Sequence, residues 1–239
     1  MKNLCCFVIS ILFLINAYAT KASVTSLDSN DQSPMFYLTS NFISEGENLR
    51  ITAIFKDVNE VVALEEKAVI NAKSAETITY SIDQRQTKEK GFVRVTDDKI
   101  KITYEVEGKP KKEIEIEKPS FLVTPGSFER WLQVNIESLK KEKTRRINFL
   151  VWDRFETIGF KVTYLGESEM SKQKVHEFKM NIDNFLIAAF VSPIRIWFSE
   201  DMKTMLRYKG RMGVKQVKGP ELKNLDAEVV YFQDLKAAQ

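Results

Sequence analysis

The sequence predicts a mainly β protein of the α+β class, in which one amphipathic helix packs against a large curved antiparallel sheet or half-open β-barrel. Three observations support this prediction. Short alternating runs lie on both sides of a central segment, that segment carries a clear helical stripe, and about eleven strands are too many for a flat open sheet. A two-layer sandwich is the alternative arrangement of the same strands.

The helix is expected to begin at Thr124-Pro125, because a hydroxyl side chain suits the N-cap and proline suits the first helical position. One apolar stripe then follows at helical spacing: Phe128, Trp131, Leu132, Ile136 and Leu139. The opposite face is polar and is expected to face solvent: Glu129, Arg130, Gln133 and Glu137.

Before the helix, runs of two-residue period predict strands with one buried and one wet face. The clearest are Leu49 to Lys56 and Lys99 to Val106. Four further strands are expected at residues 61–70, 76–83, 91–96 and 112–117. The short turns between them favour antiparallel connections.

After the helix, residues 145–152 and 157–165 are expected to form a hairpin about the turn Asp153 to Glu156. Five later strands are predicted at residues 173–182, 194–198, 204–209, 211–217 and 227–232, the third and fourth as a hairpin. The apolar run Phe185–Val191 is too short for its period to distinguish a helical turn from a sheet-core segment.

Residues 1–19 are predicted to be a secretory signal peptide, because Lys2 precedes an apolar run too short to span a bilayer. Ala17-Tyr18-Ala19 is a small-x-small cleavage pattern, with a cut expected before Thr20; a second site ends at Ala22. Residues 20–33 are expected to form a flexible leader and residues 34–239 a single β-rich domain. The protein is therefore predicted to be periplasmic or secreted, with no transmembrane span once the signal is removed.

The composition excludes several kinds of chemistry. Cys5 and Cys6, the only cysteines, lie inside the predicted signal, so no disulfide, thiol nucleophile or zinc–thiolate site is expected. The single histidine, His176, cannot build a triad or a multi-histidine metal site, and we expect it to be a surface or half-buried strand residue. Asp153 and Glu156 are interpreted as turn residues rather than a catalytic pair. No cofactor, metal or enzymatic activity is predicted.

Three segments together resemble a family of signal-bearing bacterial β-proteins of unknown function: Ser120–Glu167, Phe185–Gly213 and Leu225–Tyr231. In that family a proline-led helix precedes a strand that ends in an Asp-Arg turn, and a Gly-Phe strand follows. The resemblance covers residues 50–231 and implies a half-open sheet with a helix, similar to periplasmic carriers of lipoproteins and lipids. It implies nothing about activity.

Two candidate sites follow from this arrangement. A groove between helix and sheet for a lipid or another hydrophobic small molecule is predicted to be lined by Phe128, Trp131, Leu132, Phe149 and Phe160. A basic cluster is predicted to contact anionic groups: Lys140, Lys141, Arg145 and Arg146. The alternative is a non-catalytic structural or interaction module that binds another envelope protein. With 36 basic and 33 acidic residues the charge is nearly balanced, so no nucleic-acid partner is expected.

Overall fold

The computed structural model describes residues 17–184 and 192–232. These residues form one 15-stranded sheet, in the order β8-β7-β6-β5-β4-β3-β2-β1-β15-β14-β13-β12-β11-β10-β9. The prediction of a mainly β fold with a helix against a large open sheet is confirmed, whereas the expected number of about eleven strands is wrong.

Nine strands precede the helix in the chain, and the first eight are β1 Ala17–Ser26, β2 Phe36–Glu45, β3 Asn48–Asp57, β4 Val62–Asn71, β5 Thr77–Gln84, β6 Glu89–Val95, β7 Lys99–Val106 and β8 Lys112–Glu117. The short β9 Leu122–Val123, the 3-10 turn η1 Pro125–Ser127 and the helix α1 Phe128–Glu142 come next. Six strands follow: β10 Thr144–Val151, β11 Glu156–Met170, β12 Gln173–Ile182, β13 Ile194–Ser199, β14 Met205–Lys218 and β15 Glu221–Phe232.

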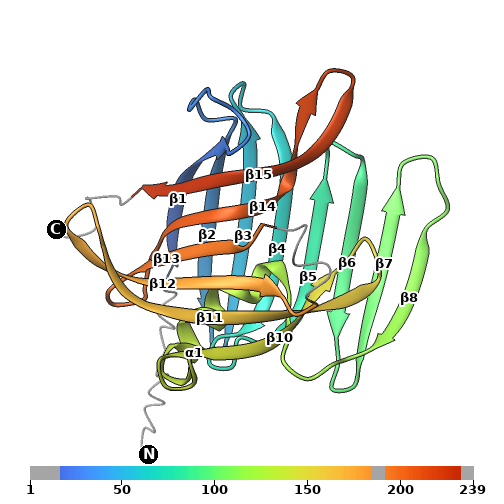
Figure 1. Cartoon of the computed structure of the whole chain (residues 1–239). Coiled ribbons are helices and arrows are strands. Elements are labelled where there is room, and N and C mark those ends of the chain that lie inside the picture. Colours follow the sequence, from blue (N-terminus) through green and yellow to red (C-terminus); the bar gives the residue numbers. More distant parts are fainter. Residues whose placement is uncertain (1–16, 185–191, 233–239) are drawn as a thin grey trace, which may run out of the picture.

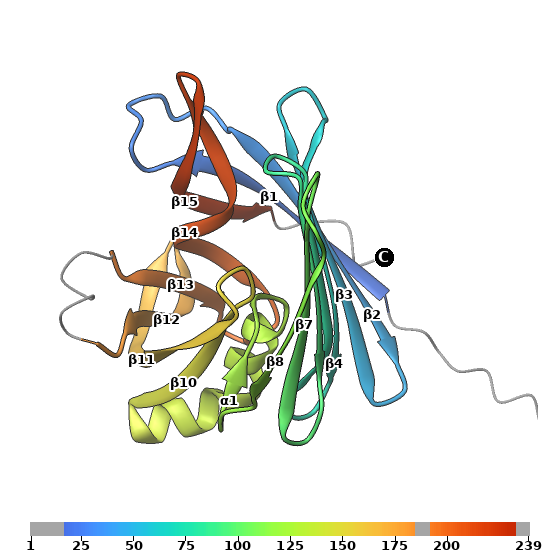
Figure 2. The same cartoon turned by 90° about the vertical axis from the view of Figure 1, so that its right-hand side faces the viewer.

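The sheet folds over itself into two layers. Strands β1–β8 form one layer, and β10–β15 cross in front of it (Figure 1). The layers are joined where β1 pairs antiparallel with β15, from Lys21 opposite Phe232 to Ser26 opposite Ala227. In the view turned by 90°, the layers stand side by side and α1 lies at their lower end (Figure 2). Every neighbouring pair is antiparallel except the parallel pair β9–β10.

Strand β1 corrects the expectation of a flexible leader for residues 20–26, whereas residues 27–33 form turns and bends that are mostly exposed. Ala22 and Val24 are fully buried and Ser26 is nearly so, so alternate side chains of β1 face the core. The buried side chains are small, and for this reason the composition of the segment resembles that of a linker. Of the predicted signal peptide, residues 1–16 lie outside the described residues, as does the apolar run 185–191; Ala17–Ala19 begin β1.

Strand β14 corrects the prediction of a hairpin within residues 204–217. The chain continues through Gly210 without turning, between β13 and β15. A Cβ at Gly210 would lie 2.7 Å from Cγ1 of Ile194, so glycine serves close packing of neighbouring strands here rather than a turn.

The helix is covered on more than its apolar stripe. Phe128, Trp131, Leu132 and Leu139 are buried, as predicted for the stripe. On the face expected to be solvent-exposed, Nε of Arg130 donates to the Ala72 carbonyl at 2.8 Å. Gln133 Nε2 donates to the Lys203 carbonyl at 3.3 Å. The helix thus contacts the β4–β5 turn of one layer and the β13–β14 loop of the other.

The core consists of two clusters. One cluster lies between the inner faces of β1–β7 and strands β14 and β15, and the other surrounds α1 and strands β10–β13. Tyr208 and Tyr231 are partly buried and pack against both clusters. The two layers are therefore held together by two separate apolar contacts with tyrosines at the boundary between them.

Candidate ligand groove

A groove of about 530 Å³ lies between α1 and the layer formed by β1–β8. Its walls come from the β4–β5 turn, the β6–β7 turn, the segment before β9, helix α1 and the start of β10. The lining residues are Ser74, Ala75, Glu76, Thr77, Val95, Asp97, Lys118, Pro119, Ser120, Phe121, Leu122, Trp131, Asn135 and Arg145.

Phe121 is the main exposed aromatic residue of the groove. Its side chain is 59 % exposed, and its backbone has φ of 54°, a left-handed conformation that bulky residues rarely adopt. An exposed aromatic side chain in a strained conformation gains little from burial in the protein itself. Such conformations occur at turns and at functional positions, where the surrounding structure maintains them. Eight other non-glycine residues of the described chain also have a positive φ.

Asn148 of β10 holds the chain on both sides of Phe121. Its backbone N–H donates to the Phe121 carbonyl at 3.0 Å, and its side-chain amide donates to the Ser120 carbonyl at 2.8 Å. Asn148 also pairs with Leu122 in the parallel β9–β10 ladder. The strained segment is thus fixed by a single residue of the neighbouring strand.

Arg145 forms the polar wall opposite Phe121. Its Nη1 donates to Oδ1 of Asn135 at 2.5 Å, and its Nε lies 3.3 Å from a carboxylate oxygen of Glu142. The guanidinium carbon lies 5.6 Å from the centre of the Phe121 ring, within the range of a cation–π contact. Three contacts therefore fix the position of this cation at the groove.

The second cation of the groove is Lys118. Its Nζ lies 3.8 Å from a carboxylate oxygen of Glu76, too far for a hydrogen bond. Its backbone N–H donates to the carbonyl of Asp98 at 2.8 Å, which ties this segment to the β6–β7 turn. The groove therefore has a mixed lining, in which charged and polar residues stand beside a smaller number of apolar side chains.

No protein-family model and no curated protein sequence matches this chain. Solved structures do resemble it. A beta-barrel-like protein of the domain of unknown function DUF1849 from Brucella abortus has 10% identity and a TM-score of 0.45, over 92% of this chain and 99% of that one. A DUF1329 family protein from Desulfovibrio piger has 10% identity and a TM-score of 0.27, over 92% and 86% of the two chains.

A LolA superfamily protein from Nitrosomonas europaea has 6% identity and a TM-score of 0.24, again over 92% of this chain and 86% of that one. Two of these three proteins belong to domains of unknown function, and the third belongs to the LolA superfamily.

Of the five apolar residues predicted to line a groove, Trp131 lines this one. Phe128 and Leu132 are buried in the core around the helix, and Phe149 and Phe160 are half-buried and pack against it. The Phe149 ring makes edge-to-face contacts with those of Phe128 and Phe160, at 6.1 Å and 5.9 Å. None of these four side chains is in the lining of this groove.

Of the four predicted basic contacts, Arg145 lines the groove. Lys140 instead pairs with Glu137 at 3.4 Å, and Arg146 pairs with Asp183 at 3.0 Å. Lys141 is exposed near the end of α1 and is absent from the lining. The predicted basic cluster is therefore divided among different surfaces.

Phe121 and Lys118 were missed by the sequence prediction. The one available signal was Pro119-Ser120, a break in the strand pattern immediately before an aromatic residue. The sequence could not show that this break lies beside Ala75 and Trp131, because those contacts arise from the packing of α1 between distant turns.

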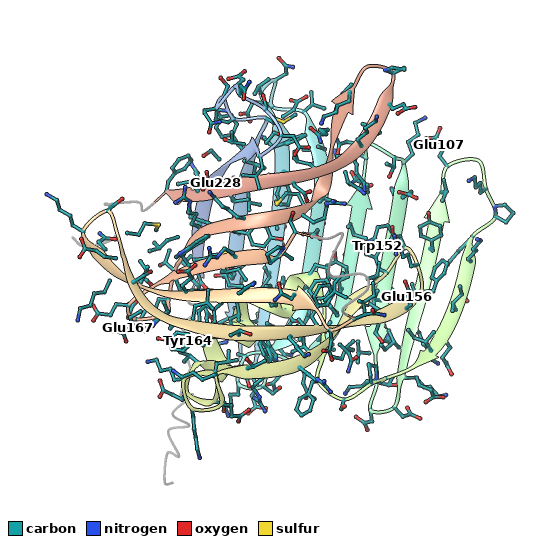
Figure 3. The ribbon with its side chains drawn as sticks, viewed as in Figure 1. Glu107, Trp152, Glu156, Tyr164, Glu167 and Glu228 are labelled. Atoms are coloured by element: carbon teal, nitrogen blue, oxygen red, sulfur yellow. The ribbon has the colours of Figure 1, made fainter. Side chains whose placement is uncertain are left out.

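The remaining chemical candidates lie away from the groove lining. His176 is only 2 % exposed, which corrects the expectation of a surface or half-buried histidine. Its Nδ1 lies 3.0 Å from the Tyr164 hydroxyl and its Nε2 lies 3.0 Å from the Glu200 carbonyl. Figure 3 shows Tyr164 on β11 and Glu156 at the far end of the same strand.

Within residues 17–184 and 192–232, no three side chains of His, Cys, Asp or Glu gather as a metal site. In the same residues, no helix has the length and apolar character needed to cross a membrane.

Proposed function

We propose that the protein binds a lipid or another hydrophobic molecule of the bacterial envelope in the groove between α1 and the β1–β8 layer. The observation that carries this proposal is the groove of about 530 Å³ with the exposed, strained Phe121 beside the Trp131 face of the helix. Its volume falls in the range of roughly 300–1,000 Å³ that is usual for small-molecule sites.

The lining supports an amphiphilic ligand. Leu122 and Val95, both half-buried, supply aliphatic surface, and Phe121 supplies an exposed aromatic ring, while Ala75 and Trp131 contribute only the edges of buried side chains. An apolar chain that covered the Phe121 ring would remove from water a side chain that the protein leaves uncovered.

The proposed role is binding without catalysis, in the periplasm or outside the cell. This location requires that the protein be exported, for which we expect residues 1–19 to act as the signal peptide. His176 and the turn Asp153 to Glu156, the features closest to catalytic groups, are absent from the lining of the groove.

The test is uptake of the apolar dye N-phenyl-1-naphthylamine by the purified protein, with native mass spectrometry of co-purified lipid. We expect fluorescence enhancement on dye binding, and Phe121→Ser should weaken it severalfold through loss of the aromatic face. Phe92→Ser is the matched control, because Phe92 is 41 % exposed on β6 and outside this groove.

Equal losses in the two variants would contradict the proposed groove. A protein that takes up no dye and carries no lipid would contradict ligand binding altogether. Recovery of one defined envelope protein in pull-downs would then favour the interaction module.

A further inference from the structure

We infer that the ligand of this groove is an amphiphile with an anionic head group, a phosphate or carboxylate, which Arg145 and Lys118 bind while Phe121 and Trp131 contact its apolar chain. This inference rests on the proposed function and adds the chemical class of the ligand.

The charged residues at the groove are unequally exposed to solvent. The side chains of Arg145 and Lys118 are 24 % and 23 % exposed, whereas those of their acidic partners Glu142 and Glu76 are 49 % and 67 % exposed. Water and salt screen an exposed carboxylate much more than a half-buried cation. The cations therefore dominate the field inside the groove. Asp97, the other acidic lining residue, is exposed at the β6–β7 turn.

The guanidinium of Arg145 is fixed in position. Its Nη1 donates to Asn135, its Nε lies 3.3 Å from a carboxylate oxygen of Glu142, and the Phe121 ring lies against it. In the described part of the chain no hydrogen bond of Nη2 is found, so its two N–H groups remain as donors. A planar guanidinium held in place suits the oxygens of a phosphate or carboxylate, because little side-chain entropy is lost on binding.

A cation and an exposed aromatic ring stand side by side in the groove. The Arg145 guanidinium carbon lies 5.6 Å from the centre of the Phe121 ring, and that side chain is 59 % exposed. A head group at Arg145 would therefore place the attached chain next to the Phe121 ring. An anionic group and an apolar chain of one ligand can each find a partner here.

The experiment measures binding of four probes to the purified protein by isothermal titration calorimetry, with the amphiphiles below their micelle concentrations. The probes are dodecyl phosphate, dodecanol, dodecyltrimethylammonium and inorganic phosphate. We expect dodecyl phosphate to bind at least about tenfold more tightly than dodecanol, and this preference should shrink as salt is raised.

Arg145→Gln should remove most of the preference for dodecyl phosphate while dodecanol binding changes little. Arg146→Gln is the matched control, since Arg146 is the next residue of β10 and pairs with Asp183 outside the groove. Lys118→Gln should lower the same preference by a smaller factor, and it provides a second variant if Arg145→Gln fails to fold. Thermal unfolding of each variant establishes that it is folded.

Equal affinity for dodecyl phosphate and dodecanol, or equal losses in the Arg145 and Arg146 variants, would overturn the anionic head group and leave the apolar groove intact. Tighter binding of dodecyltrimethylammonium would also overturn it and would indicate that Glu76 and Asp97 bind the head. Inorganic phosphate that binds as tightly as dodecyl phosphate would show a free-anion site instead. Failure of all three amphiphiles to bind would refute the proposed function itself.

Discussion

The indole of Trp152 lies directly against the backbone of Gly91: a Cβ at Gly91 would be 2.4 Å from Cε3 and 2.9 Å from Cζ3 of that ring. Trp152 is at the tip of the β10–β11 hairpin, and Gly91 belongs to β6 in the other layer (Figure 3). Tyr104 and Phe155 join this contact, with their rings 5.4 Å apart. Side-chain packing thus brings the hairpin tip onto the β6–β7 face, although no strand pairing joins β8 to β9 within the described residues.

Gly91→Ala is therefore expected to destabilise the protein by about 1–3 kcal/mol, because the Trp152 ring must move to admit the methyl group. Urea denaturation measures the change. Gly159→Ala is the control, since a Cβ at Gly159 would meet its nearest atom at 3.6 Å, an ordinary contact. Equal destabilisation by the two substitutions would show that Trp152 does not restrict residue 91.

Phe121→Gly is expected to stabilise the protein by about 1 kcal/mol, since glycine adopts a left-handed conformation without the steric cost that a phenylalanine bears. The side chain is 59 % exposed, so its removal sacrifices little burial. The same variant should lose dye binding. A protein that is more stable but binds less dye would show that Phe121 serves ligand binding and not stability. Phe92→Gly, inside strand β6, should instead destabilise; a less stable Phe121→Gly variant would argue against backbone strain at Phe121.

His176→Phe is expected to destabilise the fold by about 1–3 kcal/mol for each buried polar group that it leaves without a partner. A carbonyl accepts only, so Nε2 of His176 carries the hydrogen that bonds to Glu200, and Nδ1 accepts from the Tyr164 hydroxyl. The double variant with Tyr164→Phe should cost less than the sum of the two single changes. If the losses of stability in the two single variants simply add in the double variant, the Tyr164 hydroxyl and the His176 ring are not coupled.

Glu129 is expected to make stability depend on pH. Burial raises the pKa of this carboxyl to about 7 from its usual value near 4.5, and no hydrogen bond or ion pair of Glu129 is found among the described residues. Between these two values the folded state binds more protons than the unfolded state, so the free energy of unfolding falls as pH rises. Burial also raises the pKa of Glu66, which acts in the same direction.

Glu129→Gln should therefore flatten the decline between about pH 4.5 and 7 and should be more stable than the parent at pH 8, on the order of 1–3 kcal/mol. The two proteins should converge at pH 4. Urea denaturation across this range measures both effects. Glu137→Gln is the control on the same helix, because the side chain of Glu137 is 84 % exposed. A parent protein whose stability rises from pH 5 to 8 would contradict the raised pKa.

The sequence predicted those elements whose own residues carry a complete pattern. Strands β8 and β12 lie at the predicted residues, because strong alternation is bounded by clear turns. Strand β1 was missed because Ala22 and Ser26, small or polar residues, face the core. Strand β2 was missed too, although Phe36 and Phe42 are buried within it.

The candidate groove was predictable only in part. Trp131 and Arg145 could be proposed because each stands in a strong local pattern, an apolar stripe and a basic run. Of the other four aromatic or aliphatic candidates, two are core residues and two are half-buried against the core. Sequence periodicity distinguishes a buried face from a wet one but not a filled space from an empty one. Phe121 and Lys118 depend on a parallel strand pair and on contacts with distant turns, which no local pattern records.

The pairing of β1 with β15 has a consequence for biogenesis. Residues 21–26 find their partners more than 200 positions later in the chain, at 227–232. A nascent chain cannot form this ladder until Phe232 has left the ribosome, and closing so long a loop slows folding. Until then the edges of β1 and β14 remain unpaired and prone to misassociation. The two layers of this protein can therefore be joined only after synthesis has reached residue 232, so the fold closes as one of its last steps.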